Sequence, residues 1–229
     1  QAFVPGKSGW VVLALYGIST VLFFYSVFET STANLVFILA FNPMFGALFG
    51  WLIMGERPRW QTFLAMIVMA CGVFIIVQAG LSAGHVLGDL AALGAALLIA
   101  LAIVLSRASG RQMGYVSLVS AIIPAIVSAW FVFQQGGIQA EVPVWIVLNG
   151  TVLMPIAFFF LALAPSYIPA AQVGMFYLME TILAPVWVWL IFNEVPSAQT
   201  VAGGAILLSA LIAHSFWELS EDRRTRVAA

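Results

Sequence analysis

One carboxylate of this chain lies in the middle of an apolar run, where it could carry a proton or hold a cationic solute. Glu180 is near the centre of the run 170–192, whereas the other charged residues lie near the ends of such runs or between them. A carboxylate at mid-membrane depth costs roughly 2.5–3.5 kcal/mol on insertion scales, so it usually faces a cavity or a partner. We therefore interpret Glu180 as a proton-coupling group or as a contact for a substrate amine. The alternative is a buried, protonated Glu that is hydrogen-bonded to a neighbouring helix.

Amide side chains recur at related positions. With a displacement of 138 residues, Glu180 aligns with Asn42, and Gln172 aligns with Asn34. Asn34 precedes Asn42, and Gln172 precedes Glu180, by eight residues, which is about 80° around a helix and therefore roughly one flank. These amides are candidates for a substrate or coupling site. For Asn34 and Gln172 the favoured alternative is hydrogen bonding between helices, because both lie nearer a span end.

Aromatic and proline residues are further candidates in the same runs. Tyr177 precedes Glu180 by about one turn and Trp187 follows it by about two, so both could line a path, although packing or lipid contact is the favoured alternative. A proline inside a helix removes one backbone hydrogen bond and can act as a hinge. The hinge candidates are Pro43, Pro124, Pro155 and Pro185.

These residues are positioned by membrane-spanning helices. Hydrophobic residues make up 63% of the 229 residues, charged residues 7%, and the mean hydropathy is +1.09. A soluble domain needs more charge, and a helix needs about 20 apolar residues to cross hydrocarbon. We predict an all-α polytopic membrane protein with eight transmembrane helices at 9–28, 32–54, 60–79, 87–106, 115–134, 143–163, 170–192 and 198–217.

The charges predict an orientation. When alternate loops are assigned to two sides, all eight Lys and Arg residues fall on one side, and the loops of the other side contain only acidic and neutral residues. The positive-inside rule makes the first side cytoplasmic. Both ends of the chain are then cytoplasmic, and we expect a multi-pass protein of the bacterial cytoplasmic (inner) membrane.

An internal repeat predicts how the helices are organised. Residues 51–62 match 189–200 at seven of twelve positions, including Trp, Glu, Pro, Gln and Thr. Arg57 and Arg59 of the first copy become Val195 and Ser197 in the second, so the two loops are expected on opposite sides. This inverted-repeat pattern is typical of secondary transporters. We predict a five-plus-five fold that lacks its first two helices: 1–79 holds the last three helices of one repeat, 80–217 the complete second repeat, and 218–229 a cytoplasmic tail.

Three stretches of the first copy and one of the second are typical of a known family. They are Ala33-Asn34-Leu35 through Pro43, the segment from Gly50 to Arg57, the pair Gly72-Val73, and the second copy from Ala170 to Glu194. With these motifs the chain resembles the EamA-type drug/metabolite transporter superfamily. The resemblance implies ten helices, cytoplasmic termini, and export or uptake of amino acids or other small organic solutes. Two residues depart from the family's pattern: Asn193 stands where Gly is usual, and Thr181 occupies the place of Pro43.

The favoured function is a secondary transporter that exports small organic solutes such as amino acids or metabolites by alternating access. An accessory or signalling membrane protein and an intramembrane enzyme are the alternatives. An enzyme is disfavoured because no HExxH motif and no paired intramembrane carboxylates occur. We expect no cofactor and no metal. The expected partners are the solute, the lipid bilayer, a proton as coupling ion and a second copy in a homodimer, but no nucleic acid.

Overall fold

A computed structural model of the chain describes residues 6–110, 114–134, 136–137, 143–153, 156, 183–184, 186–191, 193 and 195–227. Every regular element within those ranges is a helix. The chain divides into two compact units, one made of Gln1–Val127 with Thr181–Ala229, and the other of Ser128–Glu180.

The first unit carries most of the described helices. They are α1 (Gly6–Glu29), α2 (Thr32–Leu39), α3 (Asn42–Phe49), the π-helix η1 (Gly50–Met54), α4 (Trp60–Ala83), α5 (Val86–Ala108), α6 (Gly114–Ser120), the start of α7 (Ile122–Gln134) and α11 (Ala198–Val227). The second unit holds the rest of α7, then α8 (Pro143–Leu148) and the π-helix η2 (Asn149–Leu153).

Five stretches of the described chain are long and apolar enough to span a membrane: Gly6–Glu29, Thr32–Met54, Trp60–Leu81, Val86–Ala108 and Ala198–Trp217. Each agrees with a predicted span to within three residues. The prediction of a polytopic helical membrane protein is thereby confirmed. The predicted spans 143–163 and 170–192 fall mostly outside the described residues.

The predicted span 32–54 is interrupted at its middle. Pro43 has no N–H to donate, so the helix cannot continue normally, and α2 ends before Ala40 while α3 begins at Asn42. The far end of the span widens into η1 and stops at Gly55, whose φ of 73° is left-handed. There the Glu56 N–H reaches back to the Gly50 carbonyl at 3.2 Å, a closure that needs the left-handed residue.

The predicted span 115–134 is also interrupted, next to Pro124, one of the predicted hinge residues. Pro124 removes the donor that the Ser120 carbonyl would use in a continuous helix, and α6 ends at Ser120 while α7 starts at Ile122. Only Leu118–Gln134 counts there as an apolar helix, and it is shorter than a full span.

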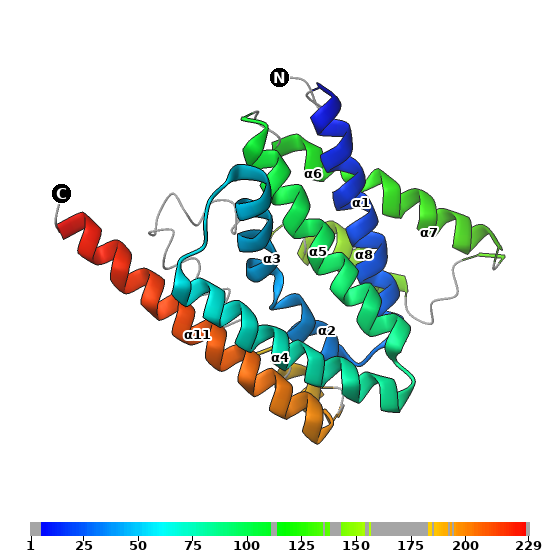
Figure 1. Cartoon of the computed structure of the whole chain (residues 1–229). Helices are drawn as coiled ribbons and strands as arrows, with labels where there is room; N and C mark the ends of the chain where they lie inside the picture. Colours follow the sequence, from blue (N-terminus) through cyan, green and yellow to red (C-terminus); the bar gives the residue numbers. More distant parts are fainter. Residues whose placement is uncertain are drawn as a thin grey trace. The chain divides into compact units, whose positions relative to one another are not determined.

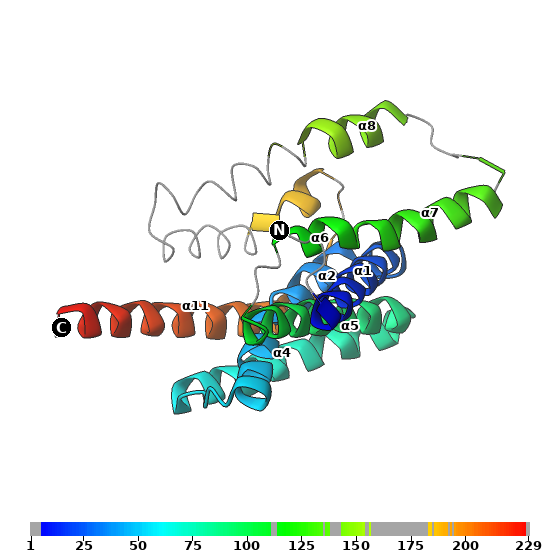
Figure 2. The same cartoon turned by 90° about the horizontal axis from the view of Figure 1, so that it is seen from above.

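Small residues let α1 and α5 approach closely, and Figure 2 shows the two helices side by side. Without large side chains, helix backbones in a membrane can pack at short range. The buried face of α5 consists largely of alanines, at positions 91, 92, 95, 96, 100 and 102. Near the start of α1, Val12 and Leu13 join Ala102 and Val116 in a buried apolar cluster.

Helices α4 and α11 lie side by side and run in opposite directions (Figure 1). Gly72 and Gly203 touch at their contact, and a Cβ built on either glycine would lie 2.7 Å from the carbonyl oxygen of the other. The buried positions in α4 include Ala65, Met69 and Val73, and those in α11 include Gly203, Leu207 and Leu211. The same offset of 138 residues that relates the sequence copies relates these three pairs.

Candidate functional site

A buried polar cluster joins helices at one end of the first unit, where α1 and α4 finish and α2, α5 and α11 begin; we call this the Asp89 end. The cluster consists of Thr30, Asn34, Asp89 and Thr200. All four side chains are buried, and Asp89 is 0% exposed. Groups that are distant in sequence therefore meet in one desolvated place.

Asp89, in the first turn of α5, is the acceptor at the centre of the cluster. Its Oδ1 accepts a hydrogen bond from the Thr30 hydroxyl at 2.5 Å and one from the Asn34 amide at 3.3 Å. Its Oδ2 receives a longer contact from the same amide, at 3.4 Å. The absence of a side chain at Gly80 makes room for the carboxyl group, because a Cβ there would clash with Asp89 Oδ2. Helix α4 thereby closes one side of the cluster.

Asn34 extends the cluster to α11. While its amide donates to Asp89, its Oδ1 accepts from the Thr200 hydroxyl at 2.7 Å. Thr200 lies in the first turn of α11. Its backbone N–H donates to Ser197 Oγ at 3.0 Å, so the Ser197 side chain caps the start of that helix. The hydrogen bonding of Asn34 is therefore between helices, which was the favoured alternative to a solute contact.

The turn between α1 and α2 is held against α5 beside this cluster. A Cβ at Gly88 would lie 2.6 Å from the Glu29 carbonyl oxygen and 2.7 Å from the Thr30 nitrogen. The same Glu29 carbonyl oxygen lies 3.0 Å from Nδ1 of His85. These backbone contacts bring Thr30 within reach of Asp89.

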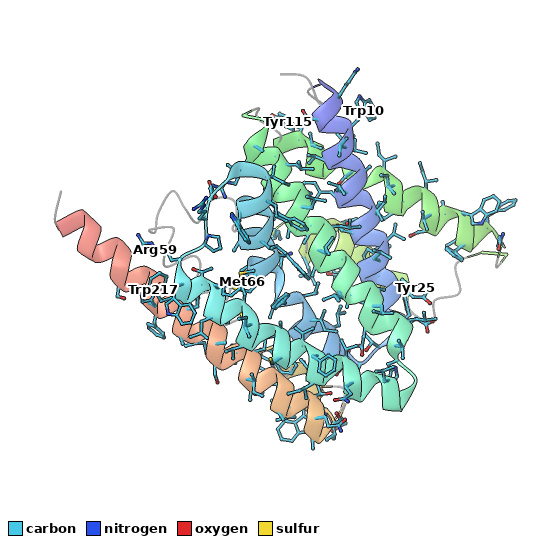
Figure 3. All side chains as sticks on the ribbon, in the orientation of Figure 1. Trp10, Tyr25, Arg59, Met66, Tyr115 and Trp217 are labelled. Atoms are coloured by element: carbon cyan, nitrogen blue, oxygen red, sulfur yellow. The ribbon has the colours of Figure 1, made fainter. Side chains whose placement is uncertain are left out.

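The opposite end, which we call the Arg107 end, carries a different set of contacts. Arg107 pairs with Glu56 at 3.1 Å, and their side chains are 59% and 51% exposed. The guanidinium of Arg59 lies 5.7 Å from the centroid of the Trp217 ring, and Figure 3 shows the two side chains next to each other. His214 Nε2 is 3.0 Å from the Thr62 hydroxyl, so it ties α11 to the start of α4.

Asn42 lies between the two ends, at the break before Pro43. Its amide donates to the Ala96 carbonyl of α5 at 3.1 Å, and the side chain is half-buried. Because Ala96 lies inside α5, its carbonyl oxygen also accepts the backbone hydrogen bond of the helix, and the Asn42 amide is its second donor. Asn42 therefore couples the broken span to α5 at mid-depth.

The other predicted site residues are placed as follows. Trp187 is 56% exposed. The structure puts Pro43 and Pro124 at the two helix breaks. Outside the described residues lie Glu180, Gln172, Tyr177, Pro155 and Pro185. Among the described residues, no group of three His, Cys, Asp or Glu side chains could hold a metal ion.

Asp89 was missed by the sequence reasoning, which treated it only as a charge near the start of the predicted span 87–106. An acidic residue in the first turn of a helix is ordinarily solvated, and its negative charge interacts favourably with the positive end of the helix dipole. The available signal was local: the Gly88-Asp89 pair follows the Gly84-His85 turn, with Gly80 one helical turn earlier. Small residues around one acid indicate that something packs closely there. The donors themselves lie 59 and 55 residues away and give no local signal.

Comparison with known proteins adds a family to this geometry. The model of the EamA-like transporter family matches residues 3–78 and 86–216 of this chain. The chain is 28% identical over 211 residues to the pseudopaline exporter CntI of Pseudomonas aeruginosa. The aligned region covers 90% of this chain and 72% of the exporter. It is 24% identical over 218 residues to solute carrier family 35 member G1 of Mus musculus. That alignment covers 82% of this chain and 56% of the carrier. No solved structure matches the chain significantly.

Proposed function

Because this chain belongs to the EamA-like transporter family, we propose that it is a secondary transporter that exports small organic solutes by alternating access. The observation that carries the proposal is the pair of family matches, 3–78 and 86–216, one on each copy of the internal repeat. Two relatives carry the names of an exporter and a solute carrier, and neither name is that of an enzyme. Amino acids and metabolites are the solute classes to test first.

The backbone supports the proposal that the two copies are equivalent. Gly55 has φ 73°, and Asn193, which lies 138 residues later, has φ 53°. Asn is among the few residues other than glycine that adopt left-handed backbone readily. Helices α4 and α11 start at Trp60 and Ala198, which are also 138 residues apart. We propose that 1–79 belongs to one repeat, 80–217 to its inverted partner, and 218–229 to a tail.

The antiparallel contact of α4 and α11 supports the inverted relation. Each helix of the pair presents the same positions of its repeat to the other, with Gly72 against Gly203 near the middle. Two similar halves in opposite orientation can exchange conformations, and this exchange opens a central site first to one side and then to the other. We propose Glu180, Asn42, Gln172, Asn34, Tyr177 and Trp187 as residues of this site and its surroundings, with Pro43, Pro124, Pro155 and Pro185 as hinges.

The charges support an orientation in the membrane. Four basic residues lie at the Arg107 end, at or next to helix termini: Lys7, Arg57, Arg59 and Arg107. Asp89 lies at the other end. We propose that the Arg107 end is cytoplasmic, in a bacterial inner membrane.

Flux through the purified protein in proteoliposomes tests the function. We expect uptake of at least one radiolabelled amino acid or metabolite from a panel, faster than in protein-free vesicles. The expected direction is out of the cytoplasm. Cells that express the protein should therefore contain less of that solute than cells that do not. No flux for any solute of a broad panel, in either imposed direction, would contradict the proposal.

A further inference from the structure

We propose that Asp89 is a proton-binding residue of the transport cycle, held by Thr30 and Asn34 and sealed from solvent when the Asp89 end is closed. The inference rests on the proposed function and adds the proton as a second ligand, bound at Asp89. It starts from geometry: a fully buried carboxyl group where α1 and α4 end and α2, α5 and α11 begin.

The charge of Asp89 has no Lys or Arg partner among the side chains that the structure describes. Arg107 lies eighteen residues further along the same helix, which is about 27 Å at 1.5 Å per residue. Lys7, Arg57 and Arg59 lie near the termini of other helices at that same distant end. Burying a carboxylate without a cation is costly, and adding one proton removes the charge.

Few titratable groups face Asp89 from the elements around it. On its own helix terminus there is His85, one turn earlier, and on the α1–α2 turn there is the exposed Glu29. Helix α2 has no titratable side chain, and neither do the adjoining parts of α4 and α11, at 76–81 and 198–204. Of the described groups near the cluster, Asp89 is the acid that solvent does not reach.

The two carboxyl oxygens differ in a way that leaves room for a proton. The short bond from Thr30 goes to Oδ1, which also accepts from the Asn34 amide at 3.3 Å. Oδ2 lies against Gly80 and receives only the 3.4 Å contact. A proton taken from solvent onto Oδ2 converts the carboxylate into the neutral acid, and both bonds to Oδ1 persist. Loss of that proton to solvent restores the charge.

The exchange of this proton is tied to movement of the helices. Thr30 and Asn34 belong to the proposed first repeat, whereas Asp89 and Thr200 belong to the second. All the bonds between these four residues therefore cross from one repeat to the other. Separation of the repeats at this end breaks them and admits water, so proton exchange and opening occur together. Binding of the proton favours closure of the Asp89 end, and release favours its opening.

Infrared spectroscopy of the purified protein tests the proton site without any solute. We expect a carboxylic-acid C=O band that disappears as the pH is raised and that is missing from Asp89→Asn. The band should remain in Glu56→Gln, a matched change of an exposed acid at the other end. A titrating band of wild-type intensity in Asp89→Asn would overturn the proposal, as would the absence of any such band in wild type.

A second variant covers the case in which Asp89→Asn does not fold. Thr30→Val keeps the carboxyl group and removes its shortest hydrogen bond, so we expect the C=O band to move in frequency while it still titrates. A band that is indifferent to Thr30→Val would show that it comes from another acid and would overturn the assignment.

Flux separates this inference from the proposed function. With a solute that the panel identifies, Asp89→Asn is expected to retain exchange of solute for solute and to lose accumulation driven by a pH gradient. Accumulation equal to that of wild type would overturn the coupling role. If wild type moved no solute but showed the Asp89 band, the transporter proposal would fail and the proton site would stand.

Discussion

Gly72 of α4 and Gly203 of α11 meet backbone to backbone, so that a Cβ on either glycine would lie 2.7 Å from the carbonyl oxygen of the other. A side chain at Gly72 would strike a carbonyl oxygen that belongs to a helix and cannot easily yield. The contact sets how closely the two helices pack.

Gly72→Leu should destabilise the protein strongly. Overpacking of a tight contact typically costs about 1–3 kcal/mol, and the clash here is with backbone. Thermal unfolding in detergent, followed by loss of the monodisperse peak, measures the effect. Ala70→Leu is the matched control, because Ala70 lies two residues away on the exposed face of α4. Equal melting temperatures for the two variants would contradict the close contact.

Thr200→Val should lower stability by removing the donor to Asn34. An unsatisfied buried acceptor costs about 1–3 kcal/mol, and Thr200 is 2% exposed. The control is Thr20→Val, since the Thr20 hydroxyl bonds to the Tyr16 carbonyl of its own helix. Thermal unfolding of the two variants side by side is the measurement. A loss no greater than that of the control would speak against the buried bond between α2 and α11.

Gly55→Ala should cost more stability than Gly55→Asn. No described atom lies within 4 Å of a Cβ at Gly55, so only the left-handed backbone of φ 73° opposes a side chain. That strain is about 1–2 kcal/mol for most residues and smaller for Asn, which already occupies the equivalent position 193 with φ 53°. The same unfolding assay ranks the variants. Ala and Asn variants of equal stability would count against the equivalence of the two turns.

The Glu56–Arg107 pair should contribute little to stability. Both side chains are more than half exposed, and exposed pairs typically contribute about 0.2–1 kcal/mol, which salt reduces. A double-mutant cycle with Glu56→Gln and Arg107→Gln, repeated at low and high salt, gives the coupling energy. A coupling that is large and insensitive to salt would show that the pair is shielded from solvent, contrary to this structure.

Glu180→Gln should weaken transport of a cationic solute through the apparent KM. Loss of about 1.4 kcal/mol of binding is a tenfold change in affinity, and a direct ionic contact in a low-dielectric site is worth at least that. Initial rates over a range of solute concentrations and pH values provide the measurement. Unchanged KM with unchanged pH dependence would remove Glu180 from both the solute site and the coupling mechanism.

The sequence predicted the spans well because each depends on local information. Hydrophobic run length and the turns between runs place α4 and α5, and Pro43 marks the break between α2 and α3 without reference to any other helix. Pro124 marks the break between α6 and α7 in the same way.

The polar cluster at the Asp89 end could not be predicted in the same way. Asp89 and its donor Thr30 are 59 residues apart, and Asn34 and Thr200 are 166 apart. Which polar residues meet depends on the rotation of each helix about its axis, which the close contacts at Gly80 and Gly88 determine. The sequence marks Asn34 as a polar residue within a span, but its hydrogen-bond partners belong to helices that no local pattern connects.

Helix α11 has one mechanical consequence beyond its packing. Its apolar window ends at Trp217, but the helix continues ten residues further, to Val227. The helix measures about 36 Å from Gly203 to Val227, so a tilt of about 10° about the contact at Gly203 would move Val227 by about 6 Å. If α11 tilts within the membrane, its end would therefore move further than its middle. Spin labels on the exposed Cys71 and on Ser220 would register such a swing as a change in distance between solute-free and solute-loaded protein, and a constant distance would mean that α11 does not rock.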